Sequence, residues 1–137
     1  MSNPIRQTVT FDASPHEVYE LLMDSKKHAK FTSSAAKISR KVGGKISAYD
    51  GYITGENVEL VEDKKIVQLW RGSDWPEGDF SRATFSLKKV KGGTKLIFTQ
   101  TGVPDEPFAP IKQGWIDFYW DPMKAMIEKK LSSNSKP

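Results

Sequence analysis

Two histidines and no cysteine set narrow limits on the chemistry that this chain of 137 residues can carry out. Without cysteine there is no disulfide, thiolate metal site or cysteine nucleophile. His16 follows Ser14-Pro15, a pattern typical of a helix start, and His28 lies in a lysine-rich stretch, so we expect both side chains to face solvent. Neither has a serine in a constrained turn beside it, as a nucleophile would need. The sequence therefore predicts no metal site and no catalytic triad.

Five carboxylates could instead do acid–base chemistry if they pointed into a cavity, where burial would raise their pKa values. No pattern brings any two of them together, so we expect surface positions and a protein that is not an enzyme. A minor alternative is a cyclase- or hydrolase-like activity, carried by one such carboxylate or by Arg82 in the cavity. The glycine pairs fit hairpin turns rather than phosphate-binding loops, so no cofactor is predicted. The five carboxylates are Glu56, Glu59, Asp79, Asp117 and Asp121.

Aromatic side chains gather in the second half of the chain and are the remaining sign of a binding site. Either they fill a well-packed core, as aromatics at helical spacing usually do, or they line a cavity between a sheet and a helix that accepts an apolar ligand. The sequence does not decide which face of the sheet carries Trp70, because in the strand alternation its side chain points away from the face of Val67 and Leu69. The predicted cavity lining is Trp70, Phe85, Phe98, Trp115, Phe118, Tyr119 and Met123.

One further tryptophan, Trp75, lies in a predicted loop between Asp74 and Pro76 rather than in a strand or a helix. A loop tryptophan either folds back onto the core as a plug or stands out as a partner contact. The sequence leaves both alternatives open. For the second, the predicted partner-binding residues are Trp75 and Glu77.

The N-terminal segment predicts a strand followed by two short helices. Ile5–Phe11 alternates apolar and polar residues, as a strand with one buried face does. The motif Ser14-Pro15-His16-Glu17 is a capping box with proline at the first helical position, so a helix begins here. Asp24-Ser25 can interrupt and recap it, which predicts a second short helix through Phe31.

The middle of the chain predicts an antiparallel meander, because its apolar stretches alternate with tight-turn signals. Glycine pairs and Asp50-Gly51 mark hairpin turns, and Gly55 indicates a bulge or bend. Together with the N-terminal strand, these segments predict a sheet of six to seven strands. The predicted strands are Ile46–Tyr49, Tyr52–Val61, Lys65–Arg71, Phe80–Val90 and Lys95–Thr101.

The C-terminal segment changes to helical spacing. Apolar residues at three- and four-residue intervals from Ile111 to Ile127 form a broad face, so we expect much of this helix to be buried. Pro122 removes one hydrogen bond and clashes with the carbonyl of Phe118, which predicts a kink near Phe118 to Asp121. Residues 1–4 and 132–137 are expected to fray. Residues 1–137 thus form a single α+β domain.

The overall composition fits a globular protein, with 37% hydrophobic and 11% aromatic residues. The formal net charge is +4, but acids are interspersed with the lysines and no nucleic-acid motif accompanies them, so we expect no nucleic-acid partner. The sequence contains no run of about 18 apolar residues, and hence no predicted membrane span. The lack of cysteine and of a signal peptide fits a cytoplasmic location.

An ordered series of motifs across the middle and C-terminal parts resembles the C-terminal domain of the eukaryotic activators of the Hsp90 chaperone's ATPase. The resemblance spans about Ile5 to Leu131. It places the chain in the activator of Hsp90 ATPase homologue (AHSA1-like) family, within the START-like superfamily that includes polyketide cyclases. The motifs are Tyr49–Val61, Ile66–Arg71, Trp75–Phe80, Gly93–Leu96, Thr101–Pro104, Gln113–Trp115 and Tyr119-Trp120.

This resemblance implies a helix-grip fold, in which a curved antiparallel sheet wraps around a long C-terminal helix. It also implies a co-chaperone-like role: binding of an Hsp90-type chaperone, with a modest effect on its ATPase. In the two-domain activators an additional N-terminal domain makes much of the chaperone contact, whereas here Met1 lies almost directly before the first predicted strand. The alternative is binding or transport of a small hydrophobic, lipid- or polyketide-like ligand in the cavity. We expect a monomer or a weak homodimer.

Overall fold

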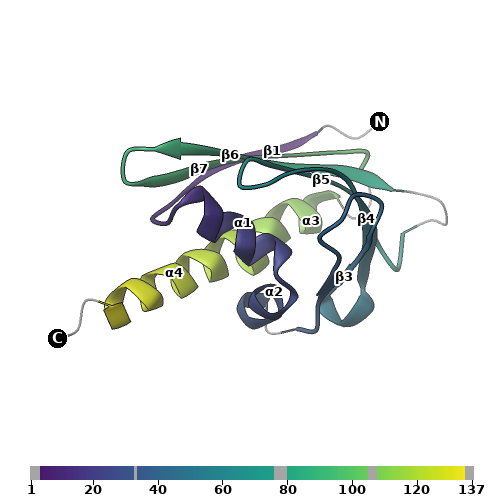
Figure 1. Ribbon diagram of the computed structural model, residues 1–137. Helices are drawn as coiled ribbons and strands as arrows, with labels where there is room; N and C mark the ends of the chain where they lie inside the picture. Colours follow the sequence, from purple (N-terminus) through teal and green to yellow (C-terminus); the bar gives the residue numbers. More distant parts are fainter. Residues whose placement is uncertain (1–3, 33, 76–79, 105–107, 135–137) are drawn as a thin grey trace.

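The computed structural model describes residues 4–32, 34–75, 80–104 and 108–134. In this part of the chain a seven-stranded antiparallel sheet has the order β1-β7-β6-β5-β4-β3-β2 (Figure 1). Strands that follow one another in sequence are neighbours from β2 to β7, and β1 pairs with β7 at the other edge. The strands are β1 (Ile5–Phe11), β2 (Lys37–Ile38), β3 (Lys45–Ala48), β4 (Ile53–Val61), β5 (Lys65–Gly72), β6 (Ser81–Val90) and β7 (Gly93–Thr101).

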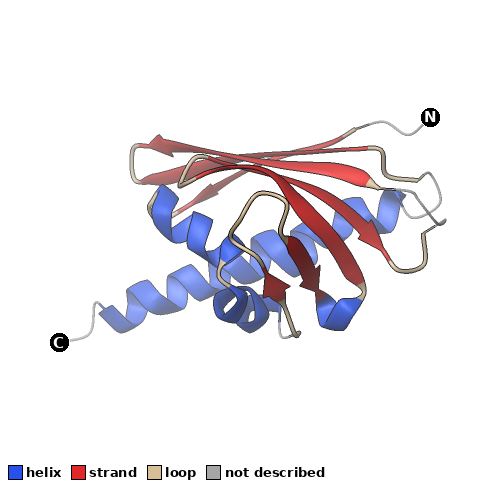
Figure 2. Cartoon of the chain, turned by 45° about the vertical axis from the view of Figure 1, so that its right-hand side comes forward, coloured by secondary structure: helices blue, strands red, loops and turns tan. Residues whose placement is uncertain are grey.

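The helices lie on one side of the curved sheet, so the sheet grips the C-terminal helical segment on its concave face (Figures 1 and 2). This arrangement confirms the predicted helix-grip fold with two short helices after the first strand. No helix among the described residues is long and apolar enough to cross a membrane. The helices are α1 (Pro15–Met23), α2 (Ser25–Thr32), α3 (Phe108–Trp115) and α4 (Asp121–Asn134), with a π-helical turn η2 (Ile116–Trp120) and a 3-10 turn η1 (Tyr49–Gly51).

The start of α1 follows the predicted capping box. The backbone N–H of Glu17 donates to Ser14 Oγ at 3.2 Å, and Pro15 occupies the first helical position. Because the side chain of Ser14 satisfies an otherwise unpaired helical N–H, the chain leaves β1 and enters α1 within a few residues.

Strand β5 places Ile66, Gln68 and Trp70 on the face that meets the helices, with Val67 and Leu69 on the opposite face. Trp70 therefore lies on the face of the sheet that meets the helices, where it is 6% exposed and part of the hydrophobic core. The polar Gln68 is accommodated among apolar neighbours because its Nε2 donates to Asn57 Oδ1 at 3.1 Å.

Three features of the meander differ from the prediction. The short strand β2 is missed by the sequence pattern, because two residues are too few to show alternation. Asp50-Gly51 forms a 3-10 turn with positive φ at both residues rather than a two-residue hairpin. The bulge predicted at Gly55 lies instead between Asn57 and Glu59. Gly55 is needed for a different reason, since a Cβ there would stand 1.8 Å from the carbonyl oxygen of Leu69.

The C-terminal helical segment carries its predicted distortion as the π turn η2. In this turn the backbone N–H of Asp121 donates to Ile116 O, one residue further back than in an α-helix. Pro122 has no N–H to offer the carbonyl of Phe118, and the hydroxyl of Tyr49 donates to that oxygen at 2.9 Å. Helical geometry then continues to Asn134, beyond the point at which fraying is predicted.

Candidate functional site

A cleft of about 580 Å³ opens between the C-terminal helical segment and the ends of β4 and β5. Its walls are mostly apolar, and the one charged side chain among its described lining residues is Asp74. Pro104, which follows β7, and Pro110 and Ile111 of α3 also line it. Seven aromatic rings contribute to the lining: Tyr49, Tyr52, Trp70, Trp75, Trp115, Phe118 and Tyr119.

Trp115 anchors the floor of this cleft. Its ring centroid lies 4.3 Å from that of Phe98, 4.5 Å from Tyr119 and 5.4 Å from Trp70. Its Nε1 donates to Gln100 Oε1 at 2.8 Å. Gln100 is itself fixed, because its Nε2 donates to the buried hydroxyl of Ser81 at 2.8 Å. A buried tryptophan with its N–H satisfied in this way gives the cleft a rigid base.

The structure divides the predicted lining residues into two groups. Trp70, Trp115, Phe118 and Tyr119 line the cleft, with the ring of Phe118 on the rim and 56% exposed. The other three are among the core residues: Phe98 and Met123 are fully buried and Phe85 is 3% exposed. Some rings of the aromatic cluster therefore fill the core and others border open space.

A second cavity of about 20 Å³ lies deeper between the sheet and α2, with Phe85, His28 and Tyr119 among its lining residues. That volume accommodates about one water molecule and no organic ligand. Four of the described residues border both spaces, namely Ile53, Trp70, Trp115 and Tyr119.

The prediction that His28 faces solvent is wrong. Its ring is 5% exposed, with Nε2 3.0 Å from the hydroxyl of Tyr119 and Nδ1 3.2 Å from Leu22 O. A carbonyl oxygen only accepts, so Nδ1 donates to Leu22 and Nε2 accepts from Tyr119, which describes a neutral imidazole. Burial lowers the pKa of His28 to about 4, against a smaller opposing effect of the Leu22 hydrogen bond. The three-residue spacing of His28 and Phe31, both buried on α2, is the signal that could have revealed this.

The hydroxyl of Tyr119 is a fixed donor to His28. Its full burial raises the pKa of this phenol well above the ordinary value of 10.0, with a smaller contribution from Tyr49. Tyr119 is thus protonated at physiological pH, and its hydrogen bond ties η2 to α2.

The ring of Trp75 folds back onto the sheet. It is 4% exposed, with its centroid 5.7 Å from that of Trp70. The loop is held by a hydrogen bond of 2.8 Å from Arg71 Nη2 to the carbonyl oxygen of Trp75. Glu77, the other predicted partner-binding residue, lies outside the described residues, so the role of this pair in partner binding stays a prediction.

The carboxylates singled out from the sequence do not line the cleft in the described part of the chain. Glu56 is partly exposed, whereas Glu59, Asp117 and Asp121 are exposed. Asp117 accepts a hydrogen bond from Gln113 Nε2 at 3.0 Å. Arg82 is also exposed, and Asp79 lies outside the described residues.

Among the lining residues that sequence reasoning missed, the ones with a polar side chain are Tyr49, Tyr52 and Asp74. The signal for the tyrosines is their position on either side of Asp50-Gly51, which brings them to one end of the sheet. The hydroxyl of Tyr52 donates to Asp74 Oδ1 at 2.6 Å.

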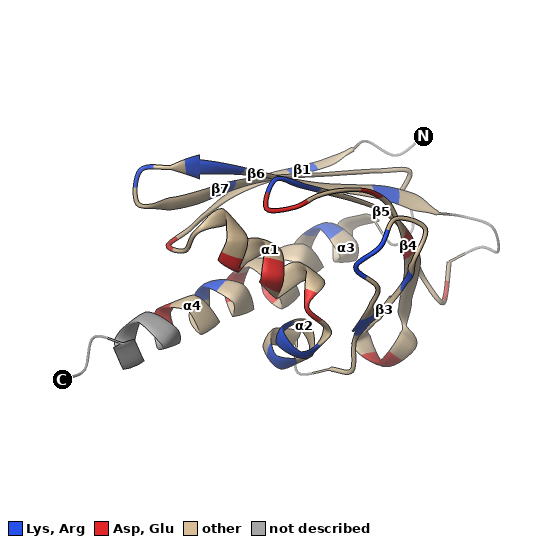
Figure 3. Ribbon diagram, viewed as in Figure 1, with Lys and Arg blue, Asp and Glu red and all other residues tan. Residues whose placement is uncertain are grey.

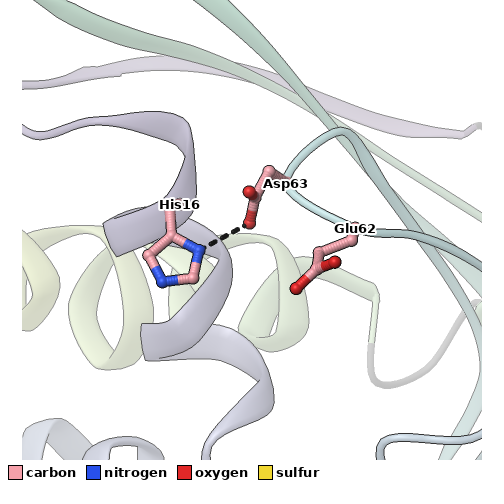
Figure 4. Close-up of side chains that lie close together, drawn as sticks. All are labelled: His16, Glu62 and Asp63. Carbon is pink, nitrogen blue, oxygen red and sulfur yellow. Dashed lines mark hydrogen bonds and ion pairs between the residues drawn. The ribbon is translucent and has the colours of Figure 1, made fainter.

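One group of side chains on the surface has the composition of a metal site. His16 of α1 and Glu62 and Asp63 of the β4–β5 turn place their candidate ligand atoms within 4.8 Å of one another (Figure 4). His16 Nδ1 lies 2.9 Å from Asp63 Oδ1, and the side chain of His16 is 60% exposed, as predicted. A surface hydrogen bond between α1 and the turn accounts for this geometry, and an exposed pair of this kind adds little stability.

Comparisons with known proteins agree with this architecture. The family model described as "Activator of Hsp90 ATPase homolog 1-like protein" matches residues 12–128. The chain is 34% identical over 115 residues to the human "Activator of 90 kDa heat shock protein ATPase homolog 1", covering 84% of this chain and 34% of that protein. It is 27% identical over 118 residues to the yeast (Saccharomyces cerevisiae) "Hsp90 co-chaperone AHA1", covering 80% of this chain and 33% of that protein. The chain thus spans about a third of the length of these curated relatives.

Solved structures extend the similarity to three dimensions. The crystal structure of an HSP90 activator from Plasmodium falciparum matches with a TM-score of 0.89 and 26% identity, covering 93% of this chain and 97% of that one. The solution structure of the Aha1 dimer from Colwellia psychrerythraea matches with a TM-score of 0.80 and 20% identity, covering 93% and 97%. At that identity the second match concerns the fold alone.

Proposed function

Because the chain belongs to the activator of Hsp90 ATPase homolog 1-like family, we propose that it is a binding domain with a co-chaperone-like role, which contacts an Hsp90-type chaperone and modulates its ATPase. The observation that carries this proposal is the family match over residues 12–128. The similarity to relatives named as activators of the chaperone supports it. The match corresponds to a third of the human relative.

A basic surface on α2, β2 and β3 is suited to contact an acidic partner. Lys26, Lys27 and Lys30 of α2 are exposed, and so are the basic residues that follow in and between the two strands (Figure 3). We call this the α2–β3 basic surface; its other members are Lys37, Lys41, Lys45 and Arg40, and the guanidinium of Arg40 pairs with Glu20. Clustered charge of one sign accelerates association with a partner of opposite charge and makes binding sensitive to salt. Within this proposal, that surface makes the first contact with the chaperone.

The test titrates the purified protein into an Hsp90-type chaperone and measures binding by calorimetry and ATP hydrolysis by phosphate release. We expect saturable binding and a rate change that reaches a plateau. Neither binding nor a rate change, at concentrations well above those of the chaperone, contradicts the proposal.

The site of contact is tested by a charge reversal with a matched control. Lys26, Lys27 and Lys30 are changed together to glutamate, and in the control Lys88, Lys89 and Lys91 of the β6–β7 hairpin are changed in the same way. We expect the α2 variant to weaken binding about tenfold or more at low salt, and the hairpin variant to have a much smaller effect. Equal losses in the two variants contradict a contact through the α2–β3 basic surface.

The second candidate function is binding of a small apolar ligand in the cleft, in keeping with a protein that is not an enzyme. A volume of about 580 Å³ lies within the range of about 300 to 1,000 Å³ that small-molecule sites occupy. Native mass spectrometry of freshly purified protein tests it by detecting a retained ligand, and it also distinguishes a monomer from a weak homodimer. A thermal-shift screen of lipids and metabolites adds a second test, because a ligand that binds only the folded state raises the melting temperature. We also propose that the protein is located in the cytoplasm.

A further inference from the structure

The indole N–H of Trp75 is a buried donor without an acceptor. The residue is 4% exposed, and among the described residues no oxygen or nitrogen accepts from its Nε1. Buried polar groups are nearly always hydrogen-bonded, and one that is not destabilises the folded state. Trp75 borders the cleft, so an acceptor bound there could satisfy this N–H.

Gly72 packs directly against this N–H. A Cβ built on Gly72 would stand 2.8 Å from Trp75 Nε1 and 2.8 Å from the hydroxyl oxygen of Tyr52. The two polar atoms therefore lie against the backbone of Gly72, and any larger residue at position 72 would displace the Trp75 ring or the Tyr52 side chain. The hydroxyl of Tyr52 is already committed as a donor to Asp74 Oδ1. Burial, together with this hydrogen bond, raises the pKa of Tyr52 to about 12.

The negative charge at this end of the cleft favours some hydrogen-bond acceptors on a ligand over others. Asp74 is the one charged side chain among the described lining residues, and no lysine or arginine accompanies it there. An anionic ligand would be repelled by this carboxylate, and it would lose its hydration without forming an ion pair in return. A carbonyl or hydroxyl oxygen can accept from Trp75 without that repulsion.

Building on the second candidate function, we infer that the cleft selects uncharged, largely apolar small molecules that carry a carbonyl or hydroxyl oxygen, with Trp75 Nε1 as the donor to that oxygen. Aromatic and aliphatic walls hold the body of the ligand, and its polar end lies at Trp75. Fatty acids and other carboxylates are disfavoured by Asp74. Trp75, which the sequence leaves open between a plug and a contact, is in this account a residue that determines ligand specificity.

The experiment uses three probes of similar shape: the ketone 2-acetylnaphthalene, the hydrocarbon 2-isopropylnaphthalene and the anion 2-naphthoate. Their dissociation constants are measured by calorimetry for the unaltered protein and for Trp75→Phe. Phenylalanine keeps an aromatic ring but removes the N–H. We expect Trp75→Phe to weaken binding of the ketone about tenfold, the factor that corresponds to about 1.4 kcal/mol. The dissociation constant of the hydrocarbon should change by less than about twofold.

A second measurement needs no variant. In the proton–nitrogen NMR spectrum, the indole signal of Trp75 should move downfield with the ketone and not with the hydrocarbon. Trp120 is the internal reference, because its indole N–H already donates to Gln7 and it is not among the described lining residues of the cleft. A third variant, Asp74→Asn, removes the charge with little change in shape. We expect this variant to bind 2-naphthoate about fivefold more tightly and to bind the hydrocarbon with the same dissociation constant.

The possible failures separate the inference from the function on which it rests. If none of the three probes binds, the cleft does not accept small molecules, and both the inference and the second candidate function are refuted. Should the ketone and the hydrocarbon respond equally to Trp75→Phe while the Trp75 signal stays in place, the inference alone is overturned. Tightest binding of 2-naphthoate to the unaltered protein also overturns the inference while leaving the cleft as a binding site.

Discussion

Mild acid should destabilise this fold through His28. The ring is 5% exposed, is held between Leu22 and Tyr119, and has a pKa lowered from 6.5 to about 4 by burial. In the unfolded chain the imidazole is hydrated and binds a proton at a pH at which the folded protein does not. Between pH 6.5 and about 4 the unfolded state therefore binds more protons, and stability falls as the pH falls.

The size of the effect follows from the pKa difference. One pKa unit corresponds to about 1.4 kcal/mol, so the shift of His28 from 6.5 to about 4 amounts to roughly 3 kcal/mol. This contribution is fully present above the unfolded pKa and is lost as the pH approaches the folded pKa. For a domain with about 5 to 15 kcal/mol of total stability, the loss is easily measured.

The assay is urea denaturation followed by tryptophan fluorescence, at pH values from about 7 to about 4.5. We expect the free energy of unfolding of the unaltered protein to fall by up to about 1.4 kcal/mol per pH unit within that window. His28→Gln keeps one donor and one acceptor, and its unfolding free energy should be much less dependent on pH. The matched control is His16→Gln, which alters an exposed ring and should keep the slope. If the unaltered protein and His28→Gln have parallel pH profiles, His28 is not buried in the neutral form.

Three further substitutions test the fold around the site by denaturation at neutral pH. Ser14→Ala removes the N-cap acceptor of α1 and should cost about 1 kcal/mol; an unchanged midpoint argues against the cap. Gly55→Ala brings a methyl group against the carbonyl of Leu69 and should cost about 2 kcal/mol or more, because backbone must move; wild-type stability contradicts this close approach. Tyr49→Phe removes the donor to Phe118 O and should cost about 1 kcal/mol, with greater protease sensitivity near η2; no change in either measure contradicts a role for this bond.

Local signals predict much of the architecture correctly. The capping box before α1, the alternation of β1 and the helical spacing of the C-terminal segment each have a period or motif that short-range physics explains. Pro122 also predicts the place of the helical distortion. Its form, a π turn with Tyr49 bonded to Phe118 O, depends on a residue far away in sequence and has no local signal.

The site is predicted less well than the fold for the same reason. His28 is surrounded by lysines in sequence, yet the helix turns it toward Tyr119, a residue 91 positions away. Phe98 and Phe118 are both aromatic candidates, but one is fully buried in the core and the other lies on the rim of the cleft. Burial of a given ring depends on which elements pack against it, and those contacts cross the whole chain.

The pairing of β1 with β7 has a consequence for how the protein is made. Ile5 lies opposite Gln100, and Gln7 accepts a hydrogen bond from Trp120. The strand β1 must therefore wait until β7 and Trp120 have left the ribosome before it finds its partners. Such a high contact order slows folding, because a long loop must close before these contacts repay its entropy. During translation, β1 is a strand with an unpaired edge, and in that period it is open to chaperones and to aggregation.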